Sequence, residues 1–134
     1  MSIVRVLSVL IVILIVGYVL FARFAQGGEA LSPTEFVEAY QPSHTLIDAR
    51  TPREYASSHL VGAINMNVLA SDFREQAAML PGDQPIYIYC ESRTRSGRAA
   101  GILEAMGFRS VYNVGGMDAL AAAGAEVEIA GPGL

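Results

Sequence analysis

The amino-acid sequence predicts an α/β fold in which helices cover both faces of a mainly parallel central sheet, preceded by one transmembrane helix. Short apolar segments that favour strands alternate with segments whose apolar residues have helical spacing. Strands that are apolar on both sides are typical of a parallel sheet buried between helical layers. An uncharged apolar run stands apart at the N-terminus, so the rest of the chain is interpreted without it.

The N-terminal run, Val6 to Ala22, carries no charge and spans about 26 Å as a helix. With its apolar neighbours it covers residues 3–24 and approaches the thickness of a membrane's hydrocarbon core. We therefore expect residues 1–25 to form a transmembrane signal anchor, residues 26–31 a linker and residues 32–134 one domain.

A cleaved secretory signal is the alternative, with Gly28-Glu29-Ala30 as a small-x-small cleavage site. The anchor is favoured because the run is longer than usual for a signal peptide and Arg23 separates it from that site. The α-amino group and Arg5 precede the run, whereas Arg23 follows it. This balance favours a cytoplasmic N-terminus and an extracytoplasmic domain, on the periplasmic side in a bacterium.

The charge of the domain argues against nucleic-acid binding. The chain has a net charge of −4, and all nine of its basic residues are arginine. Without Arg5 and Arg23, seven arginines face thirteen acids, which leaves a charge of −6. An acidic domain without a basic run is a poor partner for a polyanion.

The domain's elements follow from its caps, turns and apolar spacing. Ser32-Pro33 and Thr51-Pro52 each read as an N-cap followed by a first-turn proline. Further helices are predicted over residues 71–80, 96–106 and 117–123. Strands are predicted over residues 45–47, 63–66, 86–89 and 111–114, and the tail from residue 126 is expected to be extended. The strand over 86–89 is the strongest, and it ends at Cys90.

Cys90 is the single cysteine, which excludes an internal disulfide, a CxxC redox pair and a cysteine-rich zinc site. The two histidines are too few to build a metal cage, and we expect neither a metal nor another cofactor. Cys90 lies between a strand and the following helix, and functional crevices of such folds lie at the carboxyl ends of the strands.

The loop after Cys90 has the composition of an anion site. Its backbone N–H groups and the N-terminus of the next helix can surround an anion. Arg93, Arg95 and Arg98 add positive charge to an otherwise acidic domain. Both effects favour the thiolate over the thiol, so Cys90 is the candidate nucleophile.

This loop resembles the rhodanese active-site loop, in which an arginine stands five residues after the cysteine, as Arg95 does here. The resemblance extends to Asp48-Ala49-Arg50-Thr51-Pro52-Arg53-Glu54-Tyr55 and to His59-Leu60-Val61-Gly62-Ala63-Ile64-Asn65. It also includes Gly107-Phe108, Val111-Tyr112 and Gly115-Gly116-Met117. Together these motifs span roughly Ser32 to Val127.

The resemblance implies a rhodanese-like fold and a sulfurtransferase mechanism. A small anionic donor such as thiosulfate would deliver sulfur to Cys90, and a thiol or cyanide-like acceptor would remove it from the persulfide. Arg95 and the loop residues Glu91, Ser92, Arg93, Thr94 and Ser96 would hold the donor. Asp48, Arg50 and His59 match family motif positions and are expected to support the site.

Two features depart from the family. Glycine is usual where Arg93 stands, so Arg93 must accept a positive φ or relax the loop; we expect its side chain at the pocket mouth beside Arg95. Tryptophan often stands where Leu120 does, which concerns packing.

Two other functions remain open: a non-catalytic protein-binding module, and a cysteine phosphatase or arsenate reductase. The latter places its arginine six residues after the cysteine, where this chain has Ser96.

Overall fold

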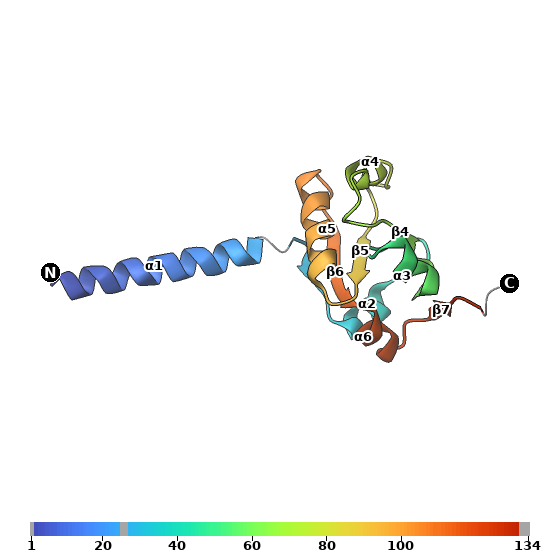
Figure 1. The fold of residues 1–134 in the computed structure, drawn as a ribbon, viewed down its shortest axis with the longest axis horizontal. Coiled ribbons are helices and arrows are strands. Elements are labelled where there is room, and N and C mark those ends of the chain that lie inside the picture. The colour runs from blue at the N-terminus through green and yellow to red at the C-terminus, as the bar shows by residue number, and fades with distance from the viewer. Residues whose placement is uncertain (1, 25–26, 132–134) are drawn as a thin grey trace.

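The computed structural model describes residues 2–24 and 27–131. A long N-terminal helix, α1, extends away from an α/β domain (Figure 1). The helices are α1 (Ile3–Phe24), α2 (Pro33–Ala39), α3 (Pro52–Ser57), α4 (Phe73–Ala77), α5 (Thr94–Ala105) and α6 (Met117–Ala122). The strands are β1 (Glu29–Ala30), β2 (Thr45–Asp48), β3 (Ser58–Leu60), β4 (Ile64–Asn65), β5 (Ile86–Cys90), β6 (Val111–Gly116) and β7 (Val127–Ile129).

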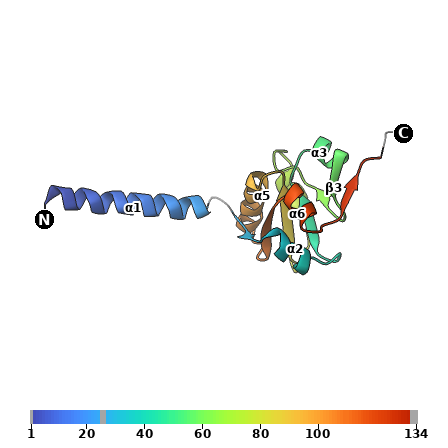
Figure 2. The same ribbon diagram turned by 90° about the horizontal axis from the view of Figure 1, so that it is seen from below.

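The central sheet has the strand order β1-β6-β5-β2-β4 within the described residues, and each neighbouring pair is parallel. Alternation along β5 divides its side chains between the two faces. Ile86, Ile88 and Cys90 join a core with α4 and α5, whereas Tyr87 and Tyr89 join a core with α2 and α6. Helices therefore lie on both faces of the sheet, as Figure 2 shows, and the predicted fold class is confirmed.

The two predicted N-caps form complete capping boxes. The Ser32 hydroxyl accepts from the Glu35 N–H, and the Glu35 carboxylate accepts from the Ser32 N–H. Thr51 and Glu54 make the same reciprocal pair at the start of α3. These boxes satisfy N–H groups that have no partner inside the helix, which explains why both helices begin where the sequence indicates.

Three features differ from the sequence prediction by more than a shift of one or two residues at the end of an element. Residues 29 and 30, expected in a linker, form β1 and pair with Tyr112 and Asn113 of β6. The helix expected over 71–80 is limited to α4, because the segments on either side form turns. The extended tail contains β7, which pairs antiparallel with β3, a strand that the sequence did not indicate.

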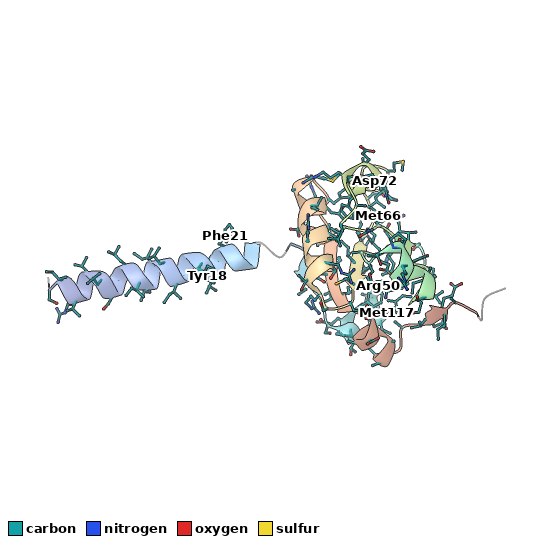
Figure 3. All side chains as sticks on the ribbon, viewed as in Figure 1. Tyr18, Phe21, Arg50, Met66, Asp72 and Met117 are labelled. Atoms are coloured by element: carbon teal, nitrogen blue, oxygen red, sulfur yellow. The ribbon has the colours of Figure 1, made fainter. Side chains whose placement is uncertain are left out.

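Helix α1 is long and apolar enough to cross a membrane. Its segment Ile3–Phe21 has a mean hydropathy of 2.9 and is not buried against the rest of the protein. Tyr18 and Phe21 project from it near its domain-facing end (Figure 3). A membrane anchor and a signal sequence both fit these properties.

Candidate active site

Cys90 is the last residue of β5, and its side chain belongs to the buried core beneath α5. The residue has no exposed surface. Its Sγ lies 3.2 Å from Oγ of Ser96, which is also fully buried. Strand β5 thus delivers the thiol to the carboxyl edge of the sheet, at the start of α5, as the sequence predicted.

Ser96 and Asn113 form a polar cluster under this thiol. Ser96 Oγ lies 2.8 Å from Asn113 Oδ1 and 3.1 Å from the Arg93 carbonyl oxygen. Both of those atoms only accept, so the Ser96 hydroxyl donates to one of them and presents its lone pairs to the Cys90 S–H. When Cys90 is a thiolate, the Ser96 hydroxyl can turn and donate to Sγ instead. Asn113 was not singled out in the sequence, although an amide within the apolar strand 111–114 was an available signal.

The backbone of the loop offers hydrogen-bond donors for an anion. Within the described part of the chain, the backbone N–H groups of residues 91–96 form no hydrogen bond to another residue. Thr94 begins α5, so these groups include the unpaired donors of a helix N-terminus. Glu91, Ser92 and Thr94 are exposed. The loop therefore places a thiol beside backbone N–H groups that are free to bind an anion.

Asp48 and Arg50 form a buried ion pair that reaches this loop. Arg50 Nη2 lies 2.8 Å from Asp48 Oδ2, and Tyr89 donates to the same carboxylate oxygen at 2.8 Å. Arg50 Nη1 lies 3.3 Å from Glu91 Oε2, next to the cysteine. Burial raises the pKa of Tyr89, so its phenol stays protonated and donates. Arg50 is buried, and Figure 3 shows it inside the domain.

Arg95 contacts α3. Its Nη1 and Nη2 lie 2.7 and 2.8 Å from the two carboxylate oxygens of Glu54. This bidentate pair joins the start of α5 to α3, and Glu54 also completes the Thr51 capping box. Glu54 was not among the predicted site residues, because its carboxylate is explained locally by the cap. In the structure Arg95 is paired with Glu54, so any contact with an anionic sulfur donor would be made by a guanidinium that already holds this carboxylate.

His59 lies on β3. Its ring stacks on Tyr55 with centroids 3.8 Å apart, and its Nδ1 lies 2.8 Å from the Tyr55 carbonyl oxygen. Its Nε2 lies 3.4 Å from the Glu128 carboxylate on β7. These contacts hold α3, β3 and β7 together, so His59 supports the domain around the site through packing.

The placement of Arg93 differs from the prediction. Arg93 takes the left-handed conformation, with a φ of 74°, so the loop keeps the shape for which glycine is usual. Its guanidinium does not stand beside Arg95, because it lies over Gly115 and donates to the carbonyls of Asn113 and Leu31. These two backbone carbonyls, one on β6 and one just after β1, hold the side chain away from the pocket mouth.

The Arg95–Glu54 pair should make the stability of the domain depend on pH in the acid range. Hydrogen bonds from Arg95 lower the pKa of Glu54 from 4.5 to about 2. A lowered carboxyl pKa adds stability above the unfolded-state value, and that stability is lost as pH falls through the folded-state value. Glu54→Gln should therefore destabilise the domain above about pH 4.5 and converge with the wild type near pH 2. Thermal unfolding from pH 2 to 7 measures this, with the exposed Glu38→Gln as control; parallel curves for wild type and Glu54→Gln would contradict it.

Comparison with known proteins identifies the family. The rhodanese-like domain family matches residues 32–123. The uncharacterised protein YqhL of Bacillus subtilis is 32% identical over 116 residues, covering 87% of each chain. Thiosulfate sulfurtransferase PspE of Escherichia coli is 32% identical over 98 residues, covering 73% of this chain and 93% of that protein. The chain therefore belongs to the rhodanese-like domain family.

Solved structures agree with this assignment. The rhodanese-like domain of the Anabaena protein Alr3790 superposes with a TM-score of 0.64 at 26% identity, covering 74% of this chain and 77% of that one. The family also occurs inside larger proteins. A tRNA uridine(34) hydroxylase of Onion yellows phytoplasma is 35% identical over 96 residues, but the match covers only 30% of its length.

Proposed function

We propose that this protein is a sulfurtransferase that moves sulfane sulfur from a donor such as thiosulfate to a thiophilic acceptor through a persulfide on Cys90. The observation that carries the proposal is the thiol at the end of β5, beside a loop whose backbone N–H groups are free to bind an anion. The similarity to a thiosulfate sulfurtransferase supports it.

The first step transfers one sulfur atom. The Cys90 thiolate attacks the outer sulfur of thiosulfate, the S–S bond of thiosulfate breaks, and its electron pair leaves with sulfite. The proton of the thiol goes to solvent before the attack. The free N–H groups of residues 91–96 would bind the negative charge of the donor and then of the persulfide. Because Cys90 has no exposed surface, the loop must move to admit the donor.

The second step restores the enzyme. An acceptor such as cyanide attacks the terminal sulfur of the persulfide. The S–S bond between Cys90 Sγ and that sulfur breaks, and the thiolate is regenerated as thiocyanate leaves. Ser96 can stabilise the thiolate by turning its hydroxyl towards Sγ, 3.2 Å away. Each step exchanges one S–S bond for another bond to the same sulfur, so no oxidant or reductant is consumed.

Steady-state kinetics test this two-step scheme. A covalent intermediate formed before the acceptor binds predicts ping-pong behaviour, with parallel double-reciprocal lines for thiosulfate at several cyanide concentrations. Intersecting lines would contradict the covalent scheme. No thiocyanate above a protein-free control would favour the non-catalytic binding module.

We further propose that α1 is retained as a membrane anchor with the domain outside the cytoplasm. Cleavage after Ala30 would cut at the end of β1, and the paired strand would be lost from the sheet. The protein should therefore remain with membranes after alkaline carbonate washing and begin at its encoded N-terminus. Fractionation with N-terminal sequencing measures this, and a soluble protein that begins at Leu31 would overturn the proposal.

A further inference from the structure

The Arg93 side chain joins the loop after Cys90 to the segment that leads to α1. We call residues 27–31 the stem. Arg93 Nη2 lies 3.2 Å from the carbonyl oxygen of Leu31, at the end of the stem. Its Nη1 lies 3.1 Å from the carbonyl oxygen of Asn113 on β6. The Leu31 N–H donates to that same Asn113 oxygen at 3.1 Å. One carbonyl oxygen therefore accepts hydrogen bonds from both the loop and the stem.

The stem is itself packed into the domain. Its strand β1 pairs with β6, and the Gly28 N–H donates to Glu104 of α5 at 2.8 Å. Gly27 is buried so closely against α5 that an added Cβ would lie 2.1 Å from the Cα of Gly101. Only glycine fits this contact, so a larger residue must push the stem away from α5.

The backbone of Arg93 continues the connection to the thiol. Its carbonyl oxygen lies 3.1 Å from Ser96 Oγ and accepts from Asn113 Nδ2 at 3.2 Å and from the Gly97 N–H at 3.0 Å. Ser96 is the residue whose hydroxyl contacts Cys90 Sγ. The left-handed conformation of Arg93 is unfavourable for a non-glycine residue, so these contacts must hold it in place.

We propose that Arg93 is a positioning residue that fastens the loop around Cys90 to the stem, so that the packing of the stem governs the rate of sulfur transfer. This inference rests on the proposed sulfurtransferase function. It also places this connection at the point where the domain meets α1, the proposed membrane anchor (Figure 1). A force or partner that displaces the stem would act on the loop directly.

In this proposal Arg93 positions the loop and does not attract the anionic sulfur donor through its charge. The Arg93 guanidinium donates to two backbone carbonyls, so it is oriented towards the stem. Removing it should therefore lower kcat more than it changes KM for thiosulfate. The ionic-strength dependence of KM should run parallel in the wild type and in Arg93→Gln.

The first arm of the test compares Arg93→Gln, Arg93→Lys and the charge control Arg109→Gln in the full chain in detergent. We expect kcat to fall about tenfold in Arg93→Gln, with KM changed less than about twofold. Arg93→Lys should be intermediate, because one ammonium cannot reproduce the planar two-carbonyl contact. Arg109→Gln should match the wild type. Full rescue by lysine together with a raised KM in Arg93→Gln would overturn the positioning role.

The second arm displaces the stem without touching the loop. Gly27→Val should lower kcat as Arg93→Gln does, whereas Gly82→Val should not, because a side chain at Gly82 meets open space. If both changes break one connection, the double variant Gly27→Val/Arg93→Gln should be little slower than either single variant. Multiplied effects, or a Gly27→Val enzyme as fast as the wild type, would overturn the coupling.

Amide hydrogen exchange separates this inference from the proposed function. The Gly97 N–H, which donates to the Arg93 carbonyl oxygen at 3.0 Å, should exchange faster in both Arg93→Gln and Gly27→Val than in Gly82→Val, whether or not the protein transfers sulfur. Faster exchange without any wild-type turnover would reject the sulfurtransferase and retain the coupling. Unchanged exchange in an active enzyme would reject the coupling alone.

Discussion

Cys90→Ser should reduce transfer from thiosulfate to cyanide to the uncatalysed background. A serine hydroxyl in place of the thiol cannot carry the transferred sulfur as a persulfide, and the chain has no second cysteine to replace it. Serine is similar in size and can keep the polar contact with Ser96, so the fold should survive. Thiocyanate production under saturating donor measures the loss.

A folded but inactive variant is the required outcome for this substitution. Circular dichroism and the thermal midpoint of Cys90→Ser should match the wild type, which separates lost chemistry from lost structure. Cys90→Ala should be equally inactive. Turnover above about 1% of wild type in a folded Cys90→Ser protein would mean that Cys90 does not carry the sulfur.

Arg50→Met should have the largest effect on stability. The substitution leaves Asp48 as a charge with no exposed surface, bonded only by Tyr89 and neighbouring backbone groups. Removing one partner of a buried pair costs about 3–5 kcal/mol, a large part of the net stability of a small domain. The midpoint of thermal unfolding should fall by more than about 10 °C.

The double variant Asp48→Asn/Arg50→Met is the matched control. It removes both charges, so it should recover part of the stability that Arg50→Met loses. The chain has no tryptophan, so tyrosine circular dichroism in the near ultraviolet follows the packing around Tyr89. A midpoint within about 3 °C of wild type in Arg50→Met would show that this ion pair does not stabilise the domain.

Local signals were sufficient to predict most of the fold. The capping boxes at Ser32 and Thr51 involve residues three apart, and both form as expected. Strand β5 is apolar on both sides, which indicated a parallel sheet between helices, and its side chains enter two cores. Short strands that depend on a distant partner were not predictable in this way. β3 and β7 each have three residues and acquire their structure from one another.

The candidate site was predictable where the chain itself places a residue, and less so where a side chain selects its partner. The position of Cys90 at the end of β5 was predictable, because Cys90 directly follows the apolar run 86–89 that predicted the strand. Arg93 and Arg95 are two residues apart, yet the first contacts the stem and the second contacts Glu54 on α3. These partners are 62 and 41 residues away in sequence, and no local pattern identifies them. The amide of Asn113 within an apolar strand was a local signal, but its contacts with Ser96 and Gly115 could not be predicted from the sequence.

The mass of the intact protein, measured before and after treatment with thiosulfate and removal of excess donor, tests the persulfide on Cys90 most directly. The wild type should gain about 32 Da, one sulfur atom, and lose it again on addition of cyanide. Cys90→Ser, treated in parallel, should gain nothing. An unchanged wild-type mass, or the same gain in Cys90→Ser, would contradict sulfur transfer through Cys90.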